Sequence, residues 1–394
     1  MIIALVGKPS VGKSTFFKAA TLADVEIHER PFTTIKTSEG VAYVNINCAD
    51  KELNTQCNPR EGFCVNHERF IPIRMIDVPG LVEKSYLGKG LGNLFLSDLN
   101  QADVLIHVID ASGSTNAKGE TVEPGTYDPA EDIRFLETEL DMWYLMILKR
   151  GWEKFARTIQ QEQLNVVKSI AKQLSGLKVT EAIVQPLIKN MKPNPTEWTE
   201  DDLLGLAREL RKETKPMVIA ANKSDLGPSK ENITRLQKDF PDYTIIPCAA
   251  DAELALREAE KSHVIAYTPG DKTFKLIKDV NEKQQQALAF IQKNILDTYE
   301  NTGIQTILNT AVFDILNYIC IFPGGLNNLK DSSGKILPDC FLLPKGTTAL
   351  QFAFRLHTDI GNNFIKAIDV NTKKPIGKDH VLKHRDIVEI MVKK

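Results

Sequence analysis

The chain has 394 residues, with 49 Lys and Arg against 51 Asp and Glu, and 42% of it is hydrophobic, which excludes a wholly disordered or fibrous protein. This length predicts more than one hydrophobic core. No apolar run approaches the roughly 18 residues that span a bilayer, and the N-terminus is too polar for a secretory signal, so we expect a cytoplasmic protein with reduced cysteines.

The first part of the chain alternates short apolar runs with segments of helical periodicity. Residues 2–6 form an apolar run that ends at Gly7, which suits a buried parallel strand, and a helix should begin near Lys13. Similar strand-like runs follow at 40–47, 70–76, 103–109, 217–221 and 243–247. This alternation predicts a doubly wound α/β sheet in which the carboxyl ends of the strands carry the ligand.

Helical spacing replaces the alternation between the fourth and fifth of these strands. The segments with helical patterns are 130–175, 180–190 and 200–213. The last of them opens with Thr199 and acidic residues, which suit a helix N-terminus. We therefore expect a helical insertion, 128–213, within a sheet domain formed by 1–127 and 214–317. The insertion either packs on the core as an outgrowth or serves as a partner-binding arm.

The end of the chain changes pattern again. After helical stretches at 281–299 and 304–317, turn signals separate runs predicted to be strands, namely 340–343, 351–356, 364–370 and 387–392. These runs predict a small β-rich domain over 318–394. It holds 12 basic and 7 acidic residues, against 37 and 44 in the rest of the chain.

A phosphate-binding motif joins the first strand to the first helix. Residues 7–14, Gly-Lys-Pro-Ser-Val-Gly-Lys-Ser, fit G-x-x-x-x-G-K-[ST] in the strand-to-helix context that this motif requires. The glycines let backbone N–H groups curl toward phosphate oxygens, and the helix N-terminus adds partial positive charge. Lys13 should reach the β- and γ-phosphates, while Ser14 ligates Mg²⁺. The nucleotide-binding residues predicted here are Gly7, Lys8, Pro9, Ser10, Val11, Gly12, Lys13, Ser14 and Thr15.

Further motifs follow later strands in the order found in GTPases. Asp77 is placed to hold Mg²⁺ through water, and Gly80 can hydrogen-bond the γ-phosphate. In Asn222-Lys223-Ser-Asp225, the Asp225 carboxylate can accept from two guanine donors that adenine lacks. The last motif, which would present a backbone N–H to the guanine carbonyl, consists of Cys248, Ala249 and Ala250.

Together these motifs resemble the Obg-like branch of the translation-factor GTPases, and most closely its YchF-type members. The resemblance includes Pro31-Phe-Thr-Thr34, Asp77-Val-Pro-Gly-Leu81 and the glycine-rich run 88–92. The end of the chain resembles a TGS domain, a β-grasp module, through the segments 343–348, 352–359 and 385–388. The resemblance implies a GTPase that binds GTP or GDP with Mg²⁺ and acts with the ribosome or its RNA.

The resemblance also implies roles for single residues. Thr34, or else Thr33, would sense Mg²⁺ and the γ-phosphate in the first switch, with an ordinary loop threonine as the alternative. Gly80 and the glycines at 88, 90 and 92 would make the second switch mobile. His107 matches a position where the family suggests a catalytic histidine, and a buried core histidine is the alternative.

Three departures from the family pattern matter. YchF-type proteins often have Glu at the position of Asp225 and are then associated with ATP, so Asp225 favours GTP and leaves ATP as the alternative. Ser10 stands where several related GTPases have an Asn that helps to hold K⁺, which puts activation by K⁺ in doubt. Leu81 replaces the glutamine that positions water in Ras-type enzymes, so hydrolysis must rely on another group or on a partner.

Three cysteines and a histidine lie in the hydrophilic stretch 48–69. Cys48, Cys57, Cys64 and His67 could form a tetrahedral Zn²⁺ site, but structural zinc sites usually show two close ligand pairs. Only Cys64 and His67 have such spacing. A long loop with incidental cysteines is therefore the favoured interpretation.

We thus expect a monomeric GTP-hydrolysing switch without membrane contact, in which GTP orders the segments around Thr34 and Gly80 and hydrolysis releases them. The alternative is a nucleotide-sensing adaptor whose hydrolysis is incidental. RNA contact is expected in the C-terminal domain, with an ordinary solvated surface as the alternative. The basic residues expected to meet phosphates are Lys345, Arg355, Lys373, Lys374, Lys378 and Arg385.

Overall fold

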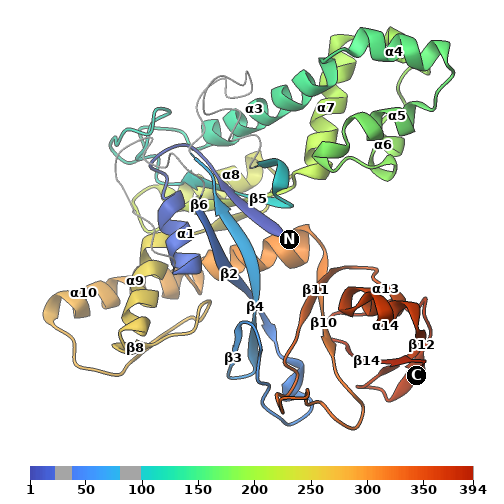
Figure 1. Ribbon diagram of the computed structural model, residues 1–394. Helices are drawn as coiled ribbons and strands as arrows, with labels where there is room; N and C mark the ends of the chain where they lie inside the picture. Colours follow the sequence, from blue (N-terminus) through green and yellow to red (C-terminus); the bar gives the residue numbers. More distant parts are fainter. Residues whose placement is uncertain (23–37, 80–98, 394) are drawn as a thin grey trace. The chain divides into compact units, whose positions relative to one another are not determined.

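The computed structural model describes residues 1–22, 38–79 and 99–393 (Figure 1). The chain forms two compact units. We call them unit 1, which is Met1–Gly40 with Arg74–Ile307, and unit 2, which is Val41–Ile73 with Leu308–Lys394. Among the described helices, none is both long and apolar enough to cross a membrane. The predicted boundaries at 128, 214 and 318 differ from this division and stay predictions.

The larger sheet consists of β1 (Ile2–Val6), β2 (Ser38–Asn47), β3 (Phe63–Val65), β4 (Glu68–Asp77), β5 (Val104–Asp110), β6 (Met217–Asn222) and β7 (Ile245–Pro247). Its order is β2-β4-β1-β5-β6-β7, with β3 paired antiparallel to β4. β1 is parallel to both β4 and β5, and β6 and β7 continue in parallel. The predicted doubly wound α/β sheet is confirmed, and the carboxyl ends of β1, β4, β5 and β6 lie at one edge.

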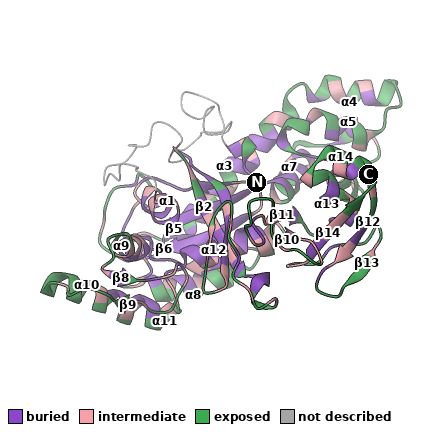
Figure 2. Cartoon of the chain, turned by 60° about the horizontal axis from the view of Figure 1, so that its bottom comes forward, coloured by how far each residue is buried: buried purple, intermediate pink, exposed green. Residues whose placement is uncertain are grey.

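The helices next to this sheet are α1 (Lys13–Thr21), α8 (Ser229–Asp239) and α9 (Ala250–Lys261). Ile109 and Ile219 of the sheet share a core cluster with Ile233 of α8, and Figure 2 shows the buried residues gathered along β5 and β6. After α9 come β8 (Ile265–Ala266), β9 (Lys275–Leu276), α10 (Glu282–Ile291), α11 (Asp297–Tyr299) and α12 (Ile304–Asn309). A π-helical turn, Gln292–Leu296, interrupts the helix predicted over 281–299.

A helical arm extends from the sheet domain and consists of α3 (Ala130–Lys149), α4 (Trp152–Gln161), α5 (Val166–Gln173), α6 (Glu181–Leu187) and α7 (Glu200–Thr214). Thr199 caps α7 as the sequence predicts, because its side chain accepts from the N–H of Asp202, whose carboxylate accepts from the N–H of Thr199. α3 and α7 run side by side (Figure 1), joined by a 2.6 Å hydrogen bond between Tyr144 and Thr214. The arm is therefore anchored by two long helices.

The smaller sheet belongs to unit 2 and consists of β10 (Tyr318–Pro323), β11 (Phe341–Pro344), β12 (Phe364–Asp369), β13 (Lys374–Ile376) and β14 (Ile387–Val392). Its order is β11-β10-β14-β12-β13. α13 (Ala349–Leu356) and α14 (Thr358–Asn362) accompany it, and a π-helical turn, Thr310–Ile315, precedes it. This is the β-grasp arrangement that the resemblance to a TGS domain implies.

One predicted strand is wrong, because residues 351–356 lie in the helix α13. Thr348 caps this helix and forms a capping box with Gln351. Phe352 and Ala353 are fully buried while Phe354 is 45% exposed, which is the pattern of one helix face. Apolar runs this short fit either a strand or a helix, and here the cap decides.

Candidate functional site

The loop between β1 and α1 curls tightly over the carboxyl end of the sheet. Gly7 has φ +146°, and a Cβ there would lie 2.3 Å from the carbonyl oxygen of Val108. Gly12 has φ +96°, and its Cβ would lie 2.2 Å from Nδ2 of Asn222. Among the described residues, no side chain caps the N-terminus of α1, so its first N–H groups can serve an anion.

Lys13 lies in the first turn of α1 and is 7% exposed. Its ammonium donates to the carbonyl oxygen of Lys8 at 2.8 Å. Burial lowers the pKa of Lys13 to about 8, since a desolvated ammonium is disfavoured. The charges of Asp77 and Asp132 oppose this shift without cancelling it, and a phosphate beside Lys13 would add a further counter-charge, which is the role predicted for this lysine.

The side chain of Lys8 interacts with other residues of the protein. Its ammonium pairs with Asp132 of α3 at 2.9 Å, donates to the carbonyl oxygen of Thr115 at 2.7 Å and lies 3.7 Å from the ring centre of Tyr127. Burial raises the pKa of Asp132 to about 6. The predicted contact of Lys8 with the nucleotide would therefore fall to its backbone N–H and stays a prediction, and the pair ties the loop to the helical arm.

The structure brings together Ser14 and Asp77, two of the residues predicted to bind Mg²⁺. The Ser14 hydroxyl donates to Oδ2 of Asp77 at 2.9 Å, and strand register sets Asp77 opposite Leu5 at the end of β4. Asp77 is fully buried, and no described residue donates to its Oδ1. A hydroxyl beside a buried carboxylate, one oxygen of which accepts no hydrogen bond from a described residue, fits Mg²⁺, which prefers oxygen ligands. The predicted residues of the two switches lie outside the described residues, namely Thr33, Thr34, Gly80, Leu81 and the glycines at 88, 90 and 92.

Asn222 joins the phosphate loop to the segment after β7. Its Nδ2 donates to the carbonyl oxygen of Val11 at 2.8 Å, and its Oδ1 accepts from the N–H of Ala250 at 3.0 Å. Asp225, three residues on, is half-buried. The carbonyl of the intervening Ser224 accepts from the Tyr299 hydroxyl at 3.1 Å. The loop that carries Asp225 is therefore fixed from two sides.

The backbone N–H groups of the segment after β7 already have acceptors in the protein. The N–H of Cys248 donates to Ala221, and that of Ala249 donates to Thr302, both at 2.9 Å. The N–H of Ala250 donates to Asn222. A guanine carbonyl at this segment would therefore have to share or replace one of these acceptors, and the predicted contact stays a prediction.

Sequence reasoning missed Asp110 at the carboxyl end of β5. It is fully buried and accepts from the hydroxyls of Ser112 at 2.6 Å, Ser114 at 2.8 Å and Thr115 at 2.5 Å, and from Lys223 at 2.8 Å. Burial acts to raise the pKa of Asp110, but Lys223 and the hydroxyls outweigh it and lower that pKa. The hydroxyl-rich run directly after a buried strand was the signal that could have revealed this cluster.

His107 lies in β5 between Val6 of β1 and Ile219 of β6. It is 1% exposed, and burial together with the nearby charges of Lys13 and Lys8 lowers its pKa to about 3. The ring is therefore neutral at physiological pH, and its Nδ1 has no hydrogen-bond partner in the described part of the chain. This burial favours the core role, while its catalytic role stays a prediction.

Family models match three parts of the chain. Residues 2–140 match the model described as 50S ribosome-binding GTPase. Residues 220–324 match that of the Obg-like GTPase YGR210-like, G4 motif-containing domain. Residues 330–392 match the TGS domain.

Two relatives and one solved structure align with most or all of this chain. An uncharacterized GTP-binding protein of Methanocaldococcus jannaschii is 47% identical over 393 residues, which cover 99% of this chain and 98% of that one. The ribosome-binding ATPase YchF of Mycoplasma genitalium is 26% identical over 92% of this chain and 86% of its own. A crystal structure of a GTP-binding protein from Pyrococcus horikoshii aligns over 100% of both chains with a TM-score of 0.79 and 39% identity.

Proposed function

This chain belongs to the Obg-like GTPases of the YchF type, with a C-terminal TGS domain, and we propose that it works as a Mg²⁺-dependent switch at the ribosome. The observation that carries this proposal is the arrangement of Lys13, Ser14 and Asp77 at one edge of the sheet. Ser14 and Asp77, together with Thr34, would hold Mg²⁺, which neutralises phosphate charge. Thr34 and Gly80 would report the γ-phosphate.

We propose GTP as the physiological nucleotide, with ATP as the alternative. Relatives named YchF are described as ATPases, whereas this chain has Asp225 after a lysine that is locked onto Asp110 at 2.8 Å. A carboxylate on a loop fixed in this way can accept from both guanine donors, the imino N–H and the exocyclic amine, and adenine lacks both. This supports guanine recognition through Asp225.

We propose a ribosomal partner, which would place the protein in the cytoplasm. The support is the family model for residues 2–140 and the name of the YchF relative. A turnover assay with and without ribosomes tests the switch, and stimulation by ribosomes is the expected result. Ribosome or RNA binding that is the same with GTP, with GDP and without nucleotide would instead favour the adaptor.

The exposed basic residues of the C-terminal domain limit where RNA could bind. Lys345, Arg355 and Lys378 are exposed, as are Lys373 and Lys374. Arg385 differs from them, because it pairs with Glu52 at 2.6 Å. Of the six residues predicted to meet phosphates, these five are therefore the ones that we propose as contacts.

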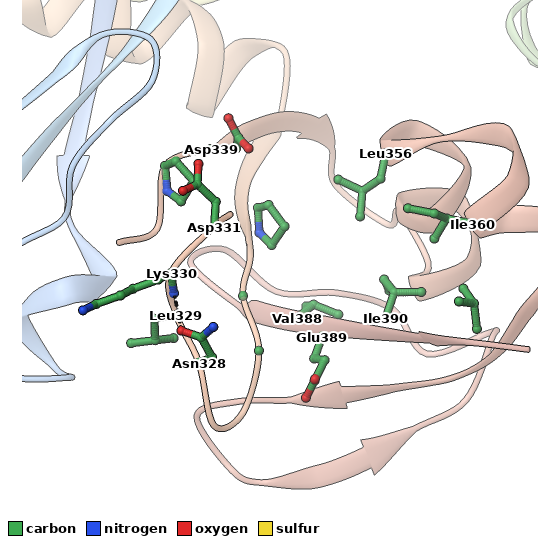
Figure 3. Close-up of a pocket in the computed structure, with 15 residues that line it drawn as sticks. Asn328, Leu329, Lys330, Asp331, Asp339, Leu356, Ile360, Val388, Glu389 and Ile390 are labelled. Carbon is green, nitrogen blue, oxygen red and sulfur yellow. Dashed lines mark hydrogen bonds between the residues drawn. The ribbon is translucent and has the colours of Figure 1, made fainter. Parts of the chain in front are cut away.

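The pocket of this domain is a poor phosphate site. The volume of this pocket is about 390 Å³, and Figure 3 shows Leu356, Ile360 and Ile390 along one side of it. The charged side chains that line it are Lys330, Asp331, Asp339 and Glu389. Arg60 pairs with two of these carboxylates, Asp331 and Asp339, so the pocket offers phosphate little net positive charge, and RNA should meet the lysines elsewhere on the surface.

The Lys373→Ala, Lys374→Ala double variant is expected to bind ribosomes or RNA less tightly and with a weaker salt dependence. Each lost phosphate contact should lower the slope of log affinity against log salt by roughly 0.7 for single-stranded RNA. Filter binding over a series of salt concentrations measures this slope. The control is the Lys283→Ala, Lys293→Ala variant, which removes two exposed lysines of unit 1. A slope that stays unchanged in the first variant would contradict RNA contact at β13.

Proton uptake is expected when GTP binds at alkaline pH. In the free protein the pKa of Lys13 is about 8, and bound phosphates would raise it because they favour the ammonium. Above about pH 8 the complex thus holds more protons than the free protein, so GTP affinity should fall as pH rises further. Calorimetry in two buffers of different ionisation enthalpy measures the uptake. The Lys13→Arg variant keeps its charge, so its remaining affinity for GTP should not fall over this pH range. A fall as large as that of the wild-type protein would contradict the assignment of the pH dependence to Lys13.

A further inference from the structure

Three cysteines and a carboxylate meet in the part of unit 2 that joins β2 to β4. The Sγ atoms of Cys48, Cys57 and Cys64 and a carboxylate oxygen of Asp50 all lie within 4.8 Å of one another. Cys48 and Cys57 are 3.5 Å apart at their sulfurs, and Cys64 Sγ is 3.8 Å from Oδ2 of Asp50. Residues separated by up to 16 positions thus present four ligand atoms to one point.

These distances fit a tetrahedral metal site. With Zn–S bonds of about 2.3 Å, two thiolates on one Zn²⁺ lie about 3.8 Å apart, close to the 3.5 Å between the sulfurs of Cys48 and Cys57. A disulfide would require sulfurs about 2.05 Å apart, and all three cysteines are free. Three thiolates also select a borderline-soft metal such as Zn²⁺ over Mg²⁺ or Ca²⁺.

The surroundings of the cluster are those of a charged centre and not of incidental buried thiols. Asp50 is fully buried, and its Oδ2 accepts from the N–H of Cys57 at 2.8 Å. His67 Nδ1 lies 2.9 Å from the other carboxylate oxygen of Asp50. Such contacts orient a carboxylate ligand from outside the first coordination sphere. Asp50 therefore takes the place at the cluster that the sequence suggested for His67.

Arg69 supplies the positive charge that a thiolate-rich site needs. It is 1% exposed, and its Nη1 donates to Cys57 Sγ at 3.4 Å and to the carbonyl oxygen of Leu337 at 3.1 Å. Its Nη2 donates to Pro338, and no ion pair joins Arg69 to a described carboxylate. A buried guanidinium without an anion is costly, and thiolates bound to Zn²⁺ would supply that anion.

From this geometry we propose that Cys48, Asp50, Cys57 and Cys64 bind one structural Zn²⁺. The site would fix the stretch 48–69 to the C-terminal domain, both within unit 2. Backbone bonds from Asn58 to Ile336 and from Arg60 to Pro338 already join them, at 2.8 and 2.9 Å. The metal would hold the loop in the shape that makes these bonds.

The test is the metal content of the full chain, expressed in zinc-supplemented medium and purified without chelators. We expect about one Zn²⁺ per chain, retained in Cys340→Ser and lost in Cys57→Ser. Cys340 is the matched control because it lies in unit 2 but outside the cluster. A zinc-free wild-type protein, iron in place of zinc, or equal zinc in the two variants would overturn the proposal.

A second measurement keeps the test decisive if Cys57→Ser does not fold. Wild-type protein stripped of metal and loaded with Co²⁺ should show the visible bands of tetrahedral cobalt and a thiolate-to-cobalt charge-transfer band. Reduced protein that binds Co²⁺ without these bands would overturn the proposal. GTP affinity should stay the same in folded Cys57→Ser, because Lys13, Asn222 and Asp225 belong to unit 1, so this test is independent of the nucleotide.

Discussion

The Asp225→Asn variant is expected to bind xanthosine triphosphate in preference to GTP. The wild-type carboxylate accepts from two guanine donors, whereas the amide of the variant offers a donor that suits the carbonyl of xanthine. Losing the match to guanine should cost about 2 to 4 kcal/mol, or roughly 30- to 1,000-fold in affinity for GTP. Titration with fluorescent GTP, ATP and xanthosine triphosphate measures the change.

The structure indicates why this substitution should act locally. Asn222 is held by Val11 and Ala250, and Lys223 by Asp110, so the loop keeps its shape when Asp225 changes. The exposed Asp279 gives the matched control, Asp279→Asn, which should leave all three affinities unchanged. If the wild-type protein binds GTP and ATP equally, Asp225 does not select the base and ATP becomes the favoured nucleotide.

The Gly12→Ala variant is expected to lose nucleotide binding by at least roughly 100-fold. Its Cβ would lie 2.2 Å from Nδ2 of Asn222, and its φ of +96° strains any L side chain. Asn222 is 2% exposed and bonded on both sides, so it can yield only by breaking buried hydrogen bonds. The phosphate loop and the segment of Ala250 would then move apart.

Gly205→Ala is the matched control for this prediction. Gly205 lies inside α7, and a Cβ there meets nothing within 4 Å. Alanine in a helix interior should stabilise the protein by about 0.5 to 1 kcal/mol, without effect on GTP. The nucleotide affinities and melting temperatures of both variants distinguish a loss of nucleotide binding from a loss of folding. Wild-type affinity in Gly12→Ala would show that the loop does not need its left-handed turn.

The sequence predicts most of the larger sheet because each strand there is a short apolar run followed by a polar motif. The phosphate loop, Asp77 and Asn222 lie at strand ends, where parallel strands bring distant motifs to one edge. The error at 351–356 has a local cause. Phe352 and Phe354 alternate with smaller or polar residues as in a strand, but a run this short is also compatible with a helix. There the cap at Thr348 carries the decisive signal.

Contacts made at long range could not be read from the sequence. Lys8 and Asp132 pair across more than a hundred residues, and no spacing rule links an insertion helix to a phosphate loop. The cysteines show the same limit, because Cys48, Cys57 and Cys64 lack the usual close pairs. A hairpin and a 3₁₀ turn, Ala49–Lys51, bring them together with Asp50.

The buried pair of Lys8 and Asp132 couples the helical arm to the phosphate loop. Both side chains are nearly inaccessible to water, and separating such a pair costs on the order of 3 to 5 kcal/mol. We therefore expect the first turn of α3 and the loop of residues 7–12 to move together. We expect a displacement of the outer helices of the arm to reach residues 7–14 through this pair, and thereby to alter the predicted phosphate site.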